Sequence, residues 1–210
     1  MMDNGGQIRC LPLLLPEKEC LARLGYSRYR TELAEAEYED IRRTMKRAFA
    51  LCEPRGVWRL AAVAGRDPDG IDLVDGRRIA SRDIAARYAG AAWIWLAAAT
   101  IGPRLPELTA GQMADGDSAA AVIGDAVGSE SADAAMDFLQ KEAAAALRRR
   151  GLRLADRRFS PGYGDLSLAH QQLFCDFLPL AEMGLRLHGS GIFLPEKTVT
   201  ALAGVEMICG

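Results

Sequence analysis

The fold is decided by Ala91–Ala99, a run of nine apolar residues with the sequence AAWIWLAAA. A strand with one face in water would alternate apolar and polar side chains, and this run does not alternate. Strands that are covered on both faces show such continuous apolar runs. The run therefore predicts a buried central strand. A buried helix remains as the alternative, because periodicity alone does not separate the two.

A region rich in strand signals precedes this run. Val57–Val63 predicts a strand, and Ile71–Val74 and Arg77–Ile79 flank Asp75-Gly76, a dipeptide that favours a tight hairpin. Asp67–Gly70 (DPDG) resembles the start of a calcium loop but lacks the closing glutamate, so a turn is the better interpretation. Hairpins of this kind predict antiparallel pairing around the central strand.

Helices are predicted on both sides of this region. The long segment from Asp117 to Arg150 is rich in alanine and predicts one long helix, with a possible bend at Gly124 or Gly128. Three further helices are expected over Glu17–Leu24, over Thr31–Cys52 with Thr31 as N-cap, and from an N-cap at Ser81 to Gly90, and another is expected to start after Pro103. The sequence therefore combines helices with a mostly antiparallel sheet.

Asp133 lies within the long predicted helix. If Val122 is placed on the buried stripe, a rotation of about 100° per residue brings Asp133 close to the same line, where a carboxylate needs a partner. Alternatively, the helix rotates at its glycines and Asp133 is solvated. Both possibilities are open from the sequence.

The segment Arg158–Asp165, with the sequence RFSPGYGD, follows the long helix. Arg153–Phe159 predicts a strand, and Pro161-Gly162 predicts a tight turn. Asp165 is a plausible N-cap for a helix through Leu168 and Phe174. The segment offers a guanidinium, an aromatic ring and a glycine that lets backbone approach a ligand. Taken alone it is more typical of a surface connector between a strand and a helix.

The end of the chain predicts two strands, one near Leu185 and one over Thr198–Val205, joined through Gly189–Gly191. This Gly-Ser-Gly does not follow a strand that leads into a helix, and the chain contains neither GxGxxG nor GK[ST]. Nucleotide binding of those two classes is therefore not expected.

Composition limits the possible functions further. The 210 residues carry a net charge of −2 with both signs interspersed, which argues against a nucleic-acid or membrane surface. The two histidines (His170 and His188) and the five cysteines, none in a CxxC pair, do not form a zinc motif. No apolar run reaches the roughly 20 residues of a spanning helix. The sequence predicts a cytoplasmic protein that binds neither nucleic acid nor membranes and holds no metal of its own.

Arg158-x-x-x-Gly162-Tyr163 is similar to the RxxxGY signature for S-adenosylmethionine in the activation (reactivation) domain of vitamin B12-dependent methionine synthase. The chain resembles most closely the free-standing bacterial relatives of that domain. The similarity touches most of residues 17–205. The other segments that carry it are Cys20–Tyr26, Ile79–Ile84, Ala98–Gly102 and Arg186–Thr200 with its Ser190, Phe193 and Pro195.

The resemblance implies a single C-shaped α+β domain over residues 17–210, with a twisted antiparallel sheet and long flanking helices, preceded by an N-terminal arm over residues 1–16. It implies a module that binds S-adenosylmethionine and supports reductive methylation of cob(II)alamin on a corrinoid-dependent methyltransferase. The partner is expected to be a corrinoid-binding protein, or a methionine synthase without its own activation domain. A flavodoxin- or ferredoxin-type protein would supply the electron. The chain is then an accessory component of a methyltransferase.

The resemblance also implies roles for charged residues. Arg158 would pair with the carboxylate of S-adenosylmethionine, and Asp133, with Glu130 as the alternative, would take its ammonium or ribose hydroxyls. No catalytic residue of the chain itself is implied, because the sulfonium and the cobalamin of the partner carry the reactivity.

The remaining implied site residues surround the turn. Ser160 and Pro161 would line the pocket, Gly162 would allow close approach, and Tyr163 would pack on the adenosine or near the sulfonium. Gly189 stands where synthase domains carry an acidic residue. A scaffold that docks on a corrinoid protein but has lost the ligand is the alternative function, whereas an independent methyltransferase is disfavoured because no general base lies near the motif.

Overall fold

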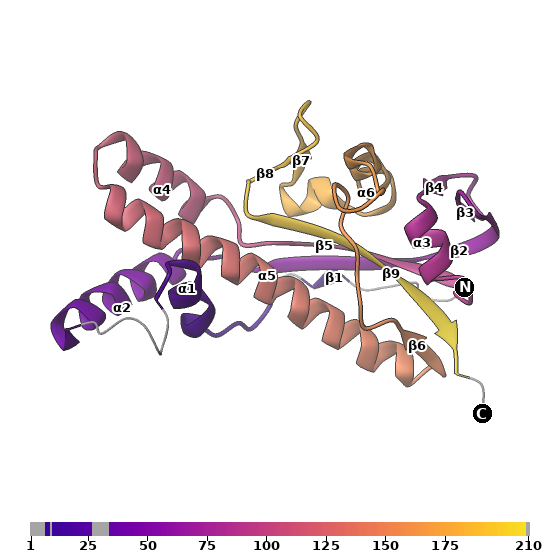
Figure 1. Ribbon diagram of the computed structural model, residues 1–210, viewed down its shortest axis with the longest axis horizontal. Helices are drawn as coiled ribbons and strands as arrows, with labels where there is room; N and C mark the ends of the chain where they lie inside the picture. The colour runs from indigo at the N-terminus through magenta and orange to yellow at the C-terminus, as the bar shows by residue number, and fades with distance from the viewer. Residues whose placement is uncertain (1–6, 9, 27–33, 209–210) are drawn as a thin grey trace.

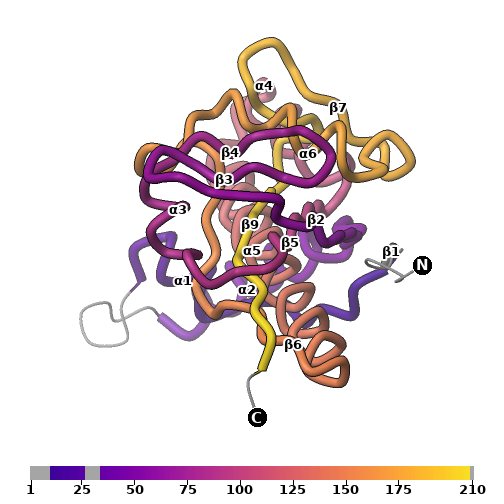
Figure 2. The backbone as a smooth tube through the Cα atoms, turned by 90° about the vertical axis from the view of Figure 1, so that its right-hand side faces the viewer, coloured from indigo at the N-terminus to yellow at the C-terminus, as the bar shows by residue number. Residues whose placement is uncertain are grey.

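The computed structural model describes residues 7–8, 10–26 and 34–208. Its main element is an antiparallel sheet with the strand order β4-β3-β2-β5-β9-β6, to which β1 adds by pairing with β2. Figures 1 and 2 show this sheet as a twisted layer with helices on both sides. The strands span Gln7–Ile8 (β1), Arg55–Asp67 (β2), Gly70–Leu73 (β3), Arg78–Ala80 (β4), Trp93–Thr100 (β5), Leu152–Leu154 (β6) and Thr198–Met207 (β9).

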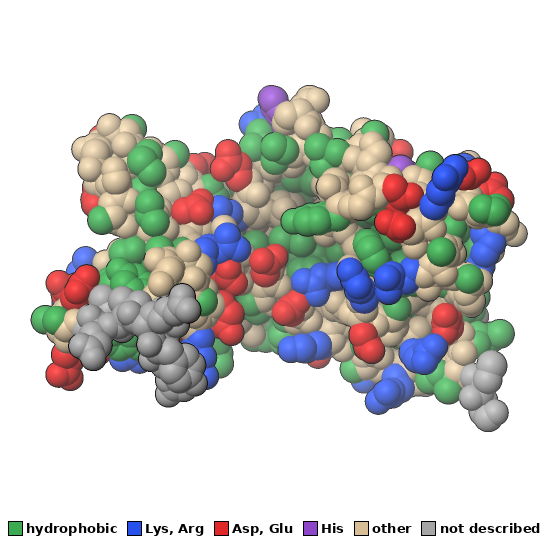
Figure 3. All heavy atoms as spheres, viewed as in Figure 1, with side chains coloured by type: hydrophobic (Ala, Val, Ile, Leu, Met, Phe, Trp, Pro, Cys, Tyr) green, Lys and Arg blue, Asp and Glu red, His purple; other side chains and the backbone are tan. Residues whose placement is uncertain are grey.

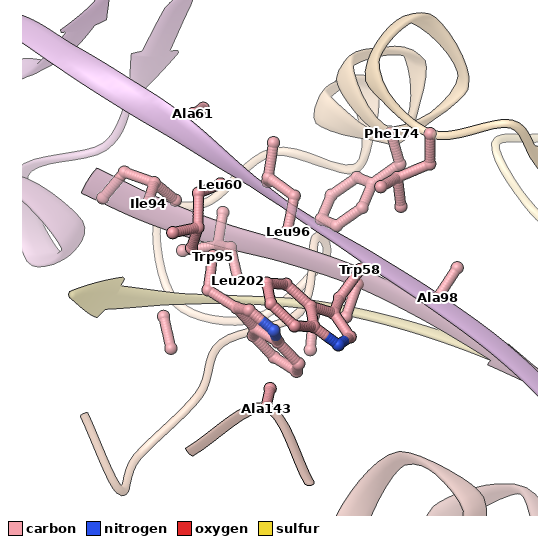
Figure 4. Packing of buried hydrophobic residues seen from close by; sticks show 14 of the residues in the cluster. Trp58, Leu60, Ala61, Ile94, Trp95, Leu96, Ala98, Ala143, Phe174 and Leu202 are labelled. Atoms are coloured by element: carbon pink, nitrogen blue, oxygen red, sulfur yellow. The ribbon is translucent and has the colours of Figure 1, made fainter. Parts of the chain in front are cut away.

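The apolar run forms β5, which lies between β2 and β9. One face of the sheet is covered by α5 (Ser118–Arg148) and the other by α6 (Gln171–Phe177), as Figure 4 shows with Trp95 directed toward Ala143 of α5 and Leu96 toward Phe174 of α6. Trp95 and Leu96 are fully buried. Burial on both faces explains the absence of alternation, and the prediction of a central strand is confirmed.

The outer hairpins follow their turn signals. β3 and β4 pair around Asp75-Gly76, where Gly76 has φ 86°, and the DPDG segment is the turn between β2 and β3. The side chain of Ser81 accepts a hydrogen bond from the Ile84 N–H at the start of α3 (Arg82–Arg87), as predicted. Local signals of turn and cap therefore determine this corner of the molecule.

Three other helices pack against the first half of α5. They are α1 (Glu17–Arg23), α2 (Glu35–Phe49) and α4 (Arg104–Ala114). Their apolar side chains form a second buried cluster around Met45, Leu105 and Val127. The predicted N-cap Thr31 lies outside the described residues, and α2 ends at Phe49, before Cys52.

The connection after α5 departs from expectation. A continuous strand over Arg153–Phe159 was expected, but β6 ends at Leu154. Phe159 alone rejoins β9, through paired backbone hydrogen bonds with Leu202. The Ala155 N–H still donates to the Gly204 carbonyl of β9, and the chain leaves the sheet after it, where the carbonyls of Ala155 and Asp156 accept hydrogen bonds from Gln140 of α5.

The C-terminal part adds short elements above the sheet in Figure 1. They are a 3₁₀ helix η1 (Leu168–His170), a second 3₁₀ helix η2 (Leu180–Met183), and the two-stranded hairpin of β7 (Arg186–Leu187) and β8 (Phe193–Leu194). In the N-terminal region, Leu11 is buried in the main core. The prediction of one α+β domain with an antiparallel sheet and long helices is confirmed. Among the described residues, no helix combines the length and the apolar character that a membrane span requires.

Candidate functional site

The outward face of α5 forms one wall of the candidate site. Asp125, Ser129, Asp133 and Asp137 follow each other at intervals of four residues, which places them on one side of the helix. Figure 3 shows the molecule hollowed near the middle of this view, with acidic and basic side chains gathered along α5 beside the hollow. The wall is therefore polar, whereas the opposite side of the same helix is buried.

Arg158 crosses from the segment after β6 to this wall. Its Nη1 donates to Oδ1 of Asp137 at 2.6 Å and to Oε1 of Gln140 at 2.9 Å. Gln140 is itself fixed, since its Nε2 donates to the carbonyls of Ala155 and Asp156. The other guanidinium nitrogens of Arg158 form no hydrogen bond with any residue that the structure describes. Arg158 is thus a positioned cation with donors to spare, beside a depression of about 300 Å³.

Asp133 lies one turn before Asp137 and is exposed. Val122, the reference for placing Asp133 on the apolar stripe, is itself 50% exposed, so that placement is wrong and the solvated alternative holds. The pKa of the Asp133 carboxyl is nevertheless raised, chiefly because neighbouring protein removes water from it and then because Glu130 is close, while Arg158 and Arg23 act in the opposite direction. Asp133 is an acceptor without a hydrogen-bond donor in the described part of the chain.

The turn after Arg158 has the predicted form. The Tyr163 N–H donates to the Ser160 carbonyl, the Gly162 N–H donates to the Leu166 carbonyl at 2.8 Å, and Gly162 has φ 96°. A φ in this range favours glycine over any residue with a Cβ atom. Pro161 is buried beneath the turn, whereas Tyr163 is 71% exposed. The turn therefore presents a glycine backbone and a free aromatic ring at the surface.

Asp165 does not cap the helix that follows it. Its carboxylate instead accepts hydrogen bonds from the Ser81 hydroxyl and from the Arg82 N–H at 2.6 Å, at the start of α3. The hydrogen bond from Ser81 holds the pKa of the Asp165 carboxyl below its ordinary value. The prediction of a local N-cap is wrong because unpaired N–H groups of a distant helix compete for the carboxylate, and Ser167 caps η1 in its place.

Sequence reasoning missed Asp137, Gln140 and Lys197. Lys197 reaches α5 from the start of β9, and its Nζ donates to Asp125 at 2.6 Å and to Ser129 at 2.9 Å. The spacing of Asp137 from Asp133 was a signal that could have placed both on one face. The partners of Gln140 and Lys197 come from other elements, so no local pattern marks them.

Other kinds of chemistry find little support. The described residues hold no group of three or more histidine, cysteine or acidic side chains that could bind a metal. Burial raises the pKa of the Cys20 thiol to about 12 and that of Cys52 to about 11, so neither is a thiolate at neutral pH. The site is better suited to holding a ligand with charges of both signs than to nucleophilic catalysis.

Comparison with known proteins relates the chain to solved structures. No protein-family model matches the chain, and no curated protein sequence matches it. A crystal structure of the MetH reactivation domain bound to AdoHcy superposes with a TM-score of 0.65 at 15% sequence identity, and the match covers 88% of this chain and 71% of that one. Despite the low identity, the chain has the fold of the MetH reactivation domain.

Proposed function

We propose that this chain binds S-adenosylmethionine between α5 and the Arg158–Tyr163 segment, next to the depression lined by Asp137, Gln140 and Arg158, and that it supports reductive methylation of a cobalamin carried by a partner protein. The observation that carries the proposal is the guanidinium of Arg158. It is held by Asp137 and Gln140 next to a glycine turn, and donors remain for a carboxylate. The shared fold with a domain that was crystallised with AdoHcy supports the same ligand class.

The charges of the ligand match the opposite charges of Arg158 and Asp133. S-adenosylmethionine carries a carboxylate, an ammonium and a sulfonium. Arg158 would receive the carboxylate through its remaining N–H groups. Asp133, whose pKa is raised chiefly because neighbouring protein removes water from it and also because Glu130 is close, would be stabilised by an approaching cation and would take the ammonium or the ribose hydroxyls.

The turn would hold the rest of the ligand. Ser160 and Pro161 would contribute backbone groups, and Gly162 would let the ligand approach its main chain without a Cβ atom in the way. The exposed ring of Tyr163 would cover the adenosine or face the sulfonium, to which an aromatic face is attractive. The chain would act by positioning, because the sulfonium and the corrinoid of the partner supply the reactivity.

The partners follow from this task. The corrinoid would belong to a methyltransferase such as a methionine synthase without its own activation domain, or to another corrinoid-binding protein, and the present chain would act on it in trans. A flavodoxin- or ferredoxin-type protein would deliver the electron. We place the complex in the cytoplasm, where such carriers operate.

Calorimetry with S-adenosylmethionine tests the proposal directly. The wild-type protein should bind, and Arg158→Ala should weaken binding about 10- to 100-fold, as expected for the loss of a charged hydrogen-bond partner worth about 1.5–3 kcal/mol. Arg153→Ala is the matched control, because Arg153 lies on the same segment but pairs with Glu206 on the exposed edge of the sheet. Absence of binding to the wild type, with and without a corrinoid partner, would overturn the proposal.

One observation favours the alternative function, a scaffold that docks on a corrinoid protein without binding the ligand. Arg158 is already paired with Asp137 without any ligand, so its charge is satisfied within the chain. If a corrinoid protein binds equally well to wild type, Arg158→Ala and Tyr163→Ala, and the ligand changes none of these affinities, the chain is a docking protein.

A further inference from the structure

The segment that contains the glycine turn is fastened to a distant corner of the fold. Asp165 follows Tyr163 by two residues, and its carboxylate accepts hydrogen bonds from the Ser81 hydroxyl, from the Arg82 N–H at 2.6 Å and, more weakly, from the Asp83 N–H at 3.4 Å. The donors therefore lie more than eighty residues away in the chain, where β4 gives way to α3. Charge-assisted bonds of this kind are stronger than those between neutral groups.

A second contact joins the same two regions. His170 Nε2 lies 3.0 Å from the Ala80 N–H and accepts its hydrogen bond, while Nδ1 lies 3.1 Å from the Ser167 carbonyl. Both contacts are satisfied by the neutral ring with its proton on Nδ1. The segment is thus attached to the β4–α3 corner both at Asp165 and at His170.

The packing between these contacts leaves little room for the turn to shift. A Cβ atom on Gly164 would lie 2.9 Å from the carboxylate of Asp83, so this glycine allows the segment to lie directly against α3. Leu166 is buried, and its N–H donates to the Tyr163 carbonyl at 3.1 Å. The side chain of Leu168 lies against Gly162 from the other side.

We propose that Asp165 is a positioning residue, which holds the Ser160–Gly164 turn against the β4–α3 corner and thereby keeps it in the geometry that binds the ligand. The effect on ligand affinity rests on the function proposed above; the effect on the turn itself does not. A binding site whose supporting contacts are removed becomes loose even when every residue that touches the ligand is still present.

The proposal is tested with Asp165→Ala and Asp165→Asn, and Asp117→Ala is the matched control. Asp117 also accepts a hydrogen bond at a helix start, from the Ala120 N–H of α5, but it lies away from the turn. Hydrogen–deuterium exchange of the ligand-free proteins reports on the turn. In Asp165→Ala, the Gly162 and Leu166 amides should exchange about tenfold faster, as expected for local opening that costs less free energy, and in Asp117→Ala they should not.

The second measurement is the affinity for S-adenosylmethionine by calorimetry. Asp165→Ala should bind about tenfold more weakly than wild type, and Asp165→Asn less so because its amide oxygen still accepts, while Asp117→Ala should bind normally. Thermal unfolding of all three variants measures any general loss of stability, and a similar loss in Asp117→Ala with normal binding would show that such a loss alone does not weaken binding. If Asp165→Ala does not fold, Asp165→Asn carries both measurements.

The outcomes separate the two proposals. Unchanged exchange at Gly162 and Leu166 overturns the positioning role, whatever the ligand does. Faster exchange with unchanged affinity also overturns it and leaves the proposed function intact. A wild-type protein that does not bind S-adenosylmethionine overturns the proposed function and the effect on affinity, whereas the exchange measurement still decides whether Asp165 holds the turn.

Discussion

The two sides of α5 differ in almost every respect. The inward side consists of small and apolar residues that are buried against the sheet and α4, among them Gly124, Ala135, Met136 and Leu139. The outward side carries Asp125, Ser129, Asp133 and Asp137, held at its two ends by Lys197 and Arg158. One side therefore serves stability and the other is available for binding, so substitutions on the two sides should have separable effects.

The largest expected effect on stability comes from the inward side. Leu139 is fully buried, and its Cδ2 lies 3.0 Å from the position of a Cβ atom on Gly56, so the side chain fills the space above a glycine of β2. Leu139→Ala should lower the free energy of unfolding by about 2–5 kcal/mol. Urea denaturation measures this change. Val122→Ala, at a half-exposed position of the same helix, should change the free energy of unfolding by no more than about 0.5 kcal/mol. Equal losses in the two variants would show that the two sides of α5 do not differ in their contribution to stability.

A smaller effect is expected where α5 meets α4. A Cβ atom on Gly124 would lie only 2.5 Å from Cγ2 of Thr109, so Gly124→Ala forces the two helices apart. Overpacking costs about 1–3 kcal/mol and outweighs the gain in helix propensity of at most about 1 kcal/mol. Thr109→Ser removes the clashing methyl group but keeps the hydroxyl that donates to Pro106, so the double variant should recover the loss. If thermal unfolding shows that the double variant is no more stable than Gly124→Ala, the close contact between Gly124 and Thr109 is contradicted.

The smallest effect on stability is expected on the outward side. Because the folded protein raises the pKa of Asp133, its charge opposes folding at neutral pH. The side chain is exposed and solvent screens its charge, so Asp133→Asn should stabilise the ligand-free protein by no more than about 0.5 kcal/mol. This difference should be complete above the raised pKa and should shrink as the pH falls toward the ordinary value of 3.8, where the wild-type carboxyl takes up its proton. Urea denaturation at several pH values measures it. A variant that is clearly less stable would show that Asp133 has a structural role.

The sequence predicted those features whose causes are local. The run at Ala91–Ala99, the Asp75-Gly76 turn, the Ser81 cap and the glycine turn at Gly162 each depend on neighbouring residues, and all four are confirmed. The general fold was accessible for the same reason and through the resemblance of short motifs to a known domain.

The features that could not be predicted from the sequence depend on contacts between distant segments. The partner of Asp165 is the start of α3, and the partner of Arg158 is Asp137 on α5. Neither pairing produces a pattern in the local sequence. The position of Asp133 stayed open because the stripe was anchored on Val122, an apolar residue that is half exposed. An apolar side chain on a helix does not by itself identify the buried side.

The register shift in β2 separates two parts of the sheet. Up to Ala62 this strand pairs with β5, whereas from Val63 onward it pairs with β3 across a register shift before Gly65. The Phe159–Asp165 segment begins on the central sheet, where Phe159 joins β9, and ends beside the outer hairpin, where Asp165 meets α3. It therefore connects the two parts of the sheet that lie on either side of this register shift. A change in the angle between these two parts of the sheet would move Phe159 and Asp165 relative to each other, and the turn at Gly162 lies between them.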